Sequence, residues 1–129
     1  MDLKKFDKYL DETKEKWGNT SEYKEYKEKS ENKTKQEFED INDRFMNIFS
    51  EFGELKHLSI EDGKVQEKIK KLQQFITDNY YTCTNEILYS LGQMYVNDER
   101  FKNNIENAGG EGTAKFVCEA ISVYCSKIR

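Results

Sequence analysis

The sequence predicts an all-α domain of about five to seven helices, and three observations support this expectation. The 129 residues include no proline, which suits a helical chain, whereas a loop-rich β-sandwich would be expected to contain some. In most segments apolar residues recur every three or four positions, which is the period of an amphipathic helix. No segment shows the alternation of apolar and polar residues that is typical of a strand. The length is that of a single domain.

Residues 1–33 form the most polar part of the chain and are expected to fold as loosely anchored helices. The first of these helices reaches Trp17 and is expected to end at Gly18. Opposite charges along the next helix would add only about 0.3 kcal/mol per pair, so little would hold it in place. The only large residues with an apolar face in that helix, at positions 21–34, are Tyr23 and Tyr26.

Residues 34–129 are expected to form the helical core, which begins with a capping box at Thr34 and Glu37. The helix behind this box is expected to end at Gly53. Its buried face is expected to consist of Phe38, Ile41, Phe45, Ile48 and Phe52, with Met46 and Phe49 flanking it. A further N-cap is expected within residues 59–62. The helix that follows carries the apolar stripe Val65, Ile69, Leu72, Ile76 and Tyr80.

The chain is expected to bend after Tyr80 and to start a new helix at Thr82 or Thr84. One face of this region would then carry Tyr80, Cys83, Ile87, Ser90 and Met94. Asn97-Asp98 is expected to cap a short helix, and residues 109–112 to form a glycine-rich turn before the last helix. This turn matches neither a Walker loop nor a dinucleotide fingerprint, so we expect no phosphate site there.

The composition combines high polarity with many aromatic residues. Charged residues make up 36% of the chain and the mean hydropathy is −0.98, which would fit a partly disordered protein. Eight Phe, eight Tyr and one Trp oppose that interpretation, because disordered segments contain few aromatic residues. The net charge of −4 disfavours binding of nucleic acid by this chain itself and attachment to an anionic membrane.

The cellular location expected from the sequence is the cytoplasm. No uninterrupted apolar run approaches the length needed to span a bilayer, and the first residues lack the apolar core of a secretory signal. The three cysteines, Cys83, Cys118 and Cys125, are an odd number without the spacing of a disulfide framework. Reduced thiols are therefore expected.

No set of residues points to catalysis, to a cofactor or to a metal. His57 is the sole histidine and lies among polar residues in a connector, so a histidine-centred triad has no support. One histidine and three cysteines at these spacings fit no standard zinc template. Carboxylates mostly alternate with lysines on polar faces, as on a solvated surface. We therefore expect a protein that is not an enzyme.

Four tyrosines and one cysteine form the most suggestive feature of the residues themselves. Tyr80, Tyr81, Tyr89 and Tyr95 gather around one predicted helix. Because each hydroxyl needs water or a partner, they suit either simple packing or the lining of a cleft for a large, partly polar ligand.

Cys83 precedes a helix start, where exposed amides would lower the pKa of a thiol and make it reactive; a packing role is the alternative.

Three sequence blocks resemble the TipAS-type antibiotic-recognition domain of MerR-like transcriptional regulators. They occur in the order found in that family and span nearly the whole chain. The most specific block has the pattern Leu-Gly-x-Met-Tyr-x-x-Asp-Glu-Arg-Phe at residues 91–101 and is preceded by Tyr81-Thr82-Cys83. The supporting blocks are Trp17-Gly18-Asn19-Thr20-Ser21-Glu22-Tyr23 with Lys27-Glu28-Lys29, and Gly112-Thr113-Ala114-Lys115-Phe116 with Glu119-Ala120-Ile121.

The resemblance implies a globin-like helical domain with a deep apolar cleft for thiopeptide or other bulky antibiotics. The N-terminal part of such domains tends to be loosely ordered until a ligand closes it, so residues 1–33 are a candidate ligand-dependent lid. In full-length members, ligand binding switches an N-terminal winged helix-turn-helix and a dimerising coiled coil. This sequence contains neither, so contact with DNA and formation of a homodimer are expected only through a part outside it.

The ligand-binding residues that we expect are Trp17, Tyr80, Tyr81, Cys83, Ile87, Ser90 and Met94. The resemblance also implies that some members trap dehydroamino acids of the ligand by addition of a thiol. Ser90 aligns with the cysteine that supplies this thiol. A serine hydroxyl does not add to a dehydroamino acid as a thiolate does, although Cys83 is near enough to be a substitute. An alternative function is a protein–protein interaction or drug-sequestering module without a DNA-binding half.

Overall fold

The computed structural model describes residues 21–127, which form six α-helices and contain no strand. The all-α class predicted from the sequence is therefore confirmed. The predicted helix before Gly18 lies outside the described residues. The helices are α2 (Ser21–Ser30), α3 (Lys35–Glu54), α4 (Gly63–Asn79), α5 (Asn85–Asn97), α6 (Glu99–Gly109) and α7 (Thr113–Lys127).

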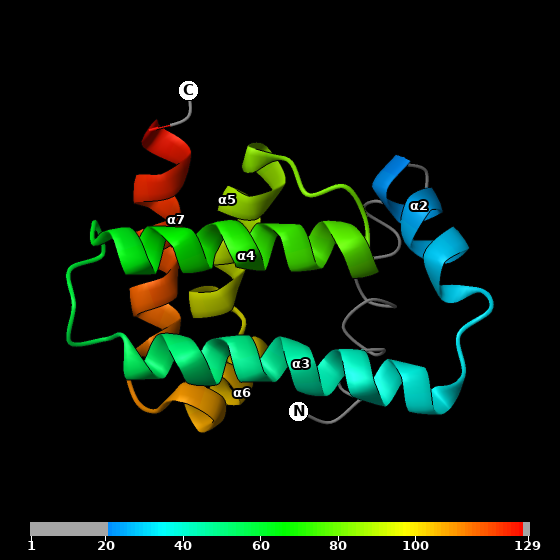
Figure 1. Ribbon diagram of the computed structural model, residues 1–129, viewed down its shortest axis with the longest axis horizontal. Helices are drawn as coiled ribbons and strands as arrows, with labels where there is room; N and C mark the ends of the chain where they lie inside the picture. The colour runs from blue at the N-terminus through cyan, green and yellow to red at the C-terminus, as the bar shows by residue number, and fades with distance from the viewer. Residues whose placement is uncertain (1–20, 128–129) are drawn as a thin grey trace.

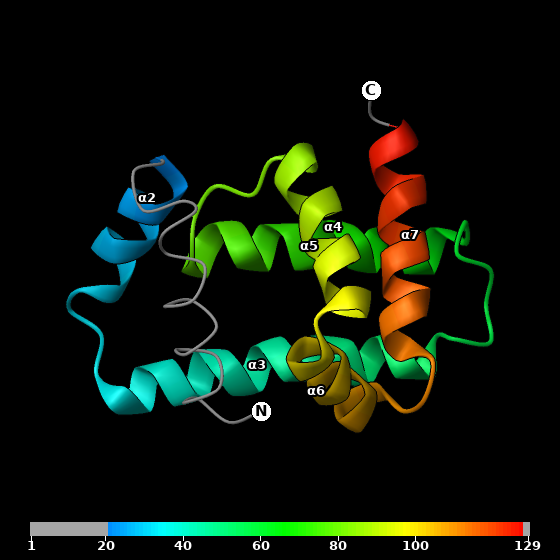
Figure 2. The ribbon, with the colours of Figure 1, turned by 180° about the vertical axis from the view of Figure 1, so that it is seen from behind.

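The helices of the core lie in two crossed layers. Helices α3 and α4 run alongside each other in opposite directions, and α5 and α7 cross behind them (Figure 1). The opposite view shows α5 and α7 side by side in front of the α3–α4 pair, with the short α6 close to α3 (Figure 2). Helix α2 lies at the end of the α3–α4 pair that is farthest from α7, so it sits beside the core rather than within it.

Side-chain caps fix the starts of four helices. Thr34 accepts a hydrogen bond from the Glu37 amide at 3.1 Å, as expected from the capping box. Thr84, not Thr82, caps α5, and its Oγ1 accepts a bond from the Ile87 amide at 3.2 Å. Such caps contribute about 1 kcal/mol each. The other two capping residues are Asp62 for α4 and Asp98 for α6, both within the predicted segments.

The glycine Gly53 does not end α3, contrary to the expectation from the sequence. The helix continues to Glu54, and Gly53 faces the end of α6, where a Cβ atom would lie 2.1 Å from the Gly109 carbonyl oxygen. The missing side chain therefore allows α3 and α6 to cross closely. Gly110, which follows α6, has a φ of 94° and makes the predicted turn before α7.

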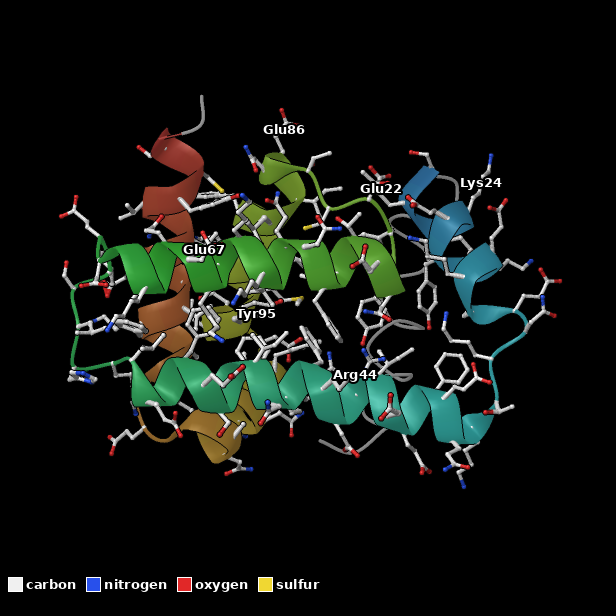
Figure 3. All side chains as sticks on the ribbon, in the orientation of Figure 1. Glu22, Lys24, Arg44, Glu67, Glu86 and Tyr95 are labelled. Carbon is white, nitrogen blue, oxygen red and sulfur yellow. The ribbon has the colours of Figure 1, made fainter. Side chains whose placement is uncertain are left out.

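The buried face of α3 is rotated relative to the predicted one. Phe49, expected at the edge, has no exposed surface, and Met46 is only 7% exposed. Phe38 and Ile48, expected in the core, are only half-buried. The reason is that α3 contacts α4, α6 and α7 together, so its central aromatic residues face several helices at once. Tyr95 of α5 lies among them, between α3 and α4 in projection (Figure 3).

Candidate functional site

Four aromatic side chains from α2, α3, α4 and the residue after α4 form one group, which we call the aromatic cluster: Tyr26, Phe45, Phe75 and Tyr80. The rings of Phe45 and Phe75 stack almost in parallel, with centroids 5.7 Å apart. Tyr80 packs at a steep angle against both of them and stacks on Tyr26 at 6.2 Å. The cluster therefore joins the outlying helix α2 to the core.

The Tyr80 side chain is almost fully buried in this cluster. Burial raises the pKa of its phenol far above the ordinary value, and the nearby Tyr26 and Tyr81 raise it further. The phenol therefore stays protonated at neutral and at moderately alkaline pH.

The α4–α5 connection, residues 80–84, is held in place by side chains of α4. The amide of Cys83 donates to Thr77 Oγ1 at 3.0 Å, and Gln73 Nε2 donates to the Cys83 carbonyl at 2.9 Å. Gln73 also donates to Asn85 Oδ1 at 2.8 Å and accepts a bond from the Tyr124 hydroxyl at 3.1 Å. One glutamine thus ties α4 to the connection, to α5 and to α7.

Besides the stacking of Tyr26 on Tyr80, polar contacts fasten helix α2 to the same region. None of its residues is buried. The carboxylate of Glu25 accepts hydrogen bonds from the Thr82 amide at 2.7 Å and the Thr82 hydroxyl at 3.0 Å. The Lys29 ammonium donates to the Thr77 carbonyl and lies 3.4 Å from Glu25. The Thr82 amide is the main cause that lowers the pKa of Glu25.

The predicted site residues differ in how far they are buried. Tyr80 and Cys83 are buried and belong to the same connection, and Tyr81 beside them is half-buried. Ile87 and Met94 are half-buried on α5 and pack against the core. Ser90 is exposed. Trp17 lies outside the described residues.

The single face predicted for Tyr80, Cys83, Ile87, Ser90 and Met94 does not form as expected. The first two residues precede α5, which begins only at Asn85, so they do not follow its helical period. This is also why Ser90 is exposed although Cys83 is buried.

The four tyrosines expected around one helix lie in three environments. Tyr95 is 1% exposed and packs edge-on against Phe49 with ring centroids 5.4 Å apart. Tyr89 is 47% exposed and lines a separate pocket of about 420 Å³ beside Cys125. Only Tyr80 and the adjacent Tyr81 remain together. The packing alternative therefore applies to Tyr95, and ligand binding by Tyr80, Tyr81 and Tyr89 stays a prediction.

The expectation that a helix start lowers the pKa of Cys83 is wrong. Burial, with a smaller contribution from the neighbouring Cys125, raises the pKa of this thiol to about 12. The Cys83 sulfur lies 3.8 Å from the Thr84 carbonyl oxygen. A carbonyl oxygen can only accept a hydrogen bond, so it does not stabilise a thiolate. Burial also raises the pKa of the Cys118 thiol, with Glu119 adding to the shift. Cys83 therefore has a packing role.

A pocket of about 570 Å³ lies beside the aromatic cluster, at the corner where the chain passes from α2 into α3; we call it the corner pocket. Arg44 and Asn79 connect the two features. The guanidinium carbon of Arg44 is 5.7 Å from the centre of the Phe75 ring, and Asn79 Nδ2 donates to the Phe75 carbonyl at 2.9 Å. The pocket is lined by Lys33, Thr34, Gln36, Glu37, Asp40, Ile41, Arg44 and Asn79.

Sequence reasoning missed Gln73, Arg44 and Glu25. A glutamine beside an apolar stripe and charged residues on polar faces are common on any helix, so composition alone did not separate them from solvated residues.

Among residues 21–127, no group of three or more His, Cys, Asp or Glu side chains is placed to hold a metal ion. None of the helices in that range is long and apolar enough to cross a membrane.

Comparison with known proteins identifies relatives over most of the chain. It is 34% identical over 117 residues to the HTH-type transcriptional activator TipA of Streptomyces coelicolor, covering 89% of this chain and 46% of that protein. It is 31% identical over 121 residues to the HTH-type transcriptional activator mta of Bacillus subtilis, covering 91% and 45%. The chain thus spans less than half the length of these relatives.

A solved structure of TipAS from Streptomyces lividans in complex with nosiheptide, part of a thiopeptide antibiotic multidrug resistance system, has the same fold. The TM-score is 0.81 with 32% identity, and the match covers 95% of this chain and 86% of that chain. The globin-like helical fold expected from the resemblance is thereby confirmed. The family model for the TipAS antibiotic-recognition domain matches residues 9–124. The chain belongs to the family of TipAS antibiotic-recognition domains.

Proposed function

We propose that this domain binds a thiopeptide-like or other bulky amphipathic antibiotic and serves as the ligand-sensing part of a MerR-like transcriptional regulator. The observation that carries the proposal is the match in fold and sequence to TipAS, whose solved structure contains nosiheptide. The HTH-type activators TipA and mta support the regulatory part of the proposal.

The ligand is proposed to lie against the aromatic cluster and the α4–α5 connection. The half-buried Tyr81 supplies aromatic surface with a polar tip, and the buried Tyr80 supports it from the aromatic cluster. The half-buried Ile87 and Met94 supply apolar surface from α5. Covering such surface contributes about 25 cal/mol per Å², so affinity would come mainly from apolar burial. Trp17 is proposed as a further contact. Cys83 supports the connection from behind, and Ser90 marks the exposed edge of α5.

Capture of the ligand is proposed to be reversible. The Ser90 hydroxyl is a poor nucleophile, and the buried Cys83 thiol has a pKa of about 12. Neither side chain therefore supplies a thiolate at neutral pH. This argues for a binding module rather than an enzyme.

Residues 1–33 are proposed to act as a lid over the core formed by residues 34–129. In the described part of this segment, α2 contributes no buried residue and is held by Glu25, Tyr26 and Lys29. All three contact residues 77–82, next to the proposed ligand. A ligand that orders this connection would therefore stabilise the closed position of α2.

Contact with DNA and dimerisation are proposed to belong to the remainder of a regulator in which this domain is one part. The fraction of TipA and mta that the chain covers, 46% and 45%, leaves room for such a part. As part of a regulator of transcription, the domain would act in the cytoplasm.

Calorimetric titration of the 129-residue chain with nosiheptide tests the proposal. We expect saturable binding and a rise in the melting temperature that grows with ligand concentration, because a ligand that binds only the folded state stabilises it. Titration with a linear apolar peptide of similar mass is the control. Absence of binding and of any thermal shift with nosiheptide and with other thiopeptides would contradict the proposed function.

A further inference from the structure

Arg44 occupies an unusual position between the aromatic cluster and the corner pocket. Its guanidinium carbon lies 5.7 Å from the centre of the Phe75 ring, and that ring stacks on Phe45 at 5.7 Å with an interplanar angle of 5°. One guanidinium and two rings thus form a column that runs from the surface into the core. Figure 3 shows Arg44 on the side of α3 that faces α4.

The Arg44 side chain is held in place while much of it stays accessible. Its Nε donates to Asp40 Oδ2 at 3.0 Å, one helical turn away. The side chain is nevertheless 55% exposed and lines the corner pocket. A guanidinium has five N–H donors, and the bond from Nε to Asp40 uses one of them. Exposed guanidinium surface and several donors therefore remain available to a ligand in the pocket.

The charges of the corner pocket offset one another. Its lining contains two cationic residues, Lys33 and Arg44, and two anionic residues, Glu37 and Asp40. The remaining polar lining residues are uncharged amides and a hydroxyl. The lining therefore carries no net formal charge that would favour ions of one sign, and its hydrogen-bonding groups suit a neutral molecule rich in donors and acceptors.

We infer that Arg44 is a specificity-determining residue of the antibiotic site. A planar conjugated part of a neutral, peptide-like ligand, either an amide plane or a heteroaromatic ring, stacks on the outer face of the Arg44 guanidinium. Carbonyl oxygens of the ligand accept bonds from its remaining N–H groups. Guanidinium planes stack on π systems and donate in a fixed plane, which a lysine ammonium does not reproduce. The inference rests on the proposed antibiotic binding and extends it to the corner pocket.

The test compares nosiheptide binding by the unsubstituted chain, Arg44→Lys and Lys115→Gln. Arg44→Lys keeps the positive charge but replaces the planar guanidinium, on which the ligand would stack, with an ammonium. We therefore expect about a tenfold loss of affinity. Lys115 is exposed on α7, a helix that lies at the end of the molecule away from α2 (Figure 1). Its substitution is expected to leave the affinity unchanged. Melting curves of all three proteins without ligand establish that the substitutions leave the fold intact.

A second measurement reads the contact directly. The chain contains three arginines, so the Nε–Hε resonance of Arg44 can be assigned by its absence from the Arg44→Lys spectrum. Stacking of a conjugated group should move this resonance upfield when nosiheptide is added, while that of Arg100 stays in place. Equal affinities of Arg44→Lys and the unsubstituted chain, or an unmoved Arg44 resonance in the complex, would overturn the role of Arg44. Neither result would contradict the proposed antibiotic binding. Failure of the unsubstituted chain to bind nosiheptide contradicts the proposed function as well.

Discussion

Cys83 illustrates how the surroundings of a single residue decide its chemistry. A cysteine near a helix start would be reactive if its thiol faced the exposed amides of the first turn. Here Thr84 caps α5 instead, and the Cys83 amide donates a hydrogen bond to the Thr77 hydroxyl. Cys83 is only 5% exposed. Burial outweighs the helix start, and the pKa rises to about 12.

We predict that Cys83 resists alkylation by iodoacetamide at pH 7 in the folded protein. Its thiolate fraction is negligible there, because pH 7 lies far below a pKa of about 12. Peptide mass spectrometry measures the reaction at each cysteine over time, and the protein unfolded in urea provides the reference. Modification of Cys83 at the same rate in both states would contradict its burial.

The same shift has a consequence for stability at alkaline pH. The folded-state pKa of Cys83 is raised above the ordinary value of 9.0, so between pH 9 and 12 the unfolded state loses this proton first. The unfolded state therefore binds fewer protons, and the free energy of unfolding should fall as the pH rises through 9. Urea unfolding at pH 8 and pH 10 measures this change. A stability that rises over this range would contradict the direction of the shift.

Two elements, α3 and α6, depend on a glycine contact where they cross. Gly53→Ala would place a Cβ atom 2.1 Å from the Gly109 carbonyl oxygen, so the helices would have to separate. We predict a loss of about 2 kcal/mol in the free energy of unfolding. Gly63→Ala at the start of α4 is the matched control, since nothing lies within 4 Å of its Cβ position. Its expected effect is a gain of about 0.5 kcal/mol. Urea unfolding measures both, and equal midpoints would contradict the close crossing.

The attachment of α2 is predicted to depend on pH through Glu25. The folded-state pKa of Glu25 is lowered from 4.5, so the contribution of its carboxylate is present above that value and is lost as the pH falls below it. We expect Glu25→Gln to accelerate amide hydrogen exchange in residues 21–30 at pH 7, with a smaller effect at pH 3.5.

Glu28→Gln is the control for this prediction, because Glu28 is exposed on the same helix. Equal exchange rates in the two variants at pH 7 would show that the bonds from Glu25 to Thr82 do not hold α2.

At the scale of the whole molecule, the helices were predictable because the signals that define them are local. Thr34, Asp62 and Asp98 cap helices within the predicted segments, and the stripe from Val65 to Ile76 is buried as expected. The rotated face of α3 was not predictable, because several helices that come later in the chain decide which of its apolar residues are covered.

The candidate site was less predictable than the fold for the same physical reason. The aromatic character of Tyr80 indicated that it belongs to the candidate site. Its partners Tyr26 and Phe45 could not be predicted, because they come from distant positions in the sequence. Arg44 and Gln73 acquire their roles only from contacts with α4, α5 and α7. A single-sequence pattern contains no signal for such contacts between elements.

The central claim is that an antibiotic binds beside the aromatic cluster and stabilises the closed position of α2. Hydrogen exchange of the chain with and without nosiheptide tests it most directly. We predict slower exchange in residues 21–34 and 77–94, with little change in α6, because the ligand would order the connection and the helix docked on it. Exchange that is unchanged by nosiheptide, or slowed only in α6 and α7, would contradict the claim.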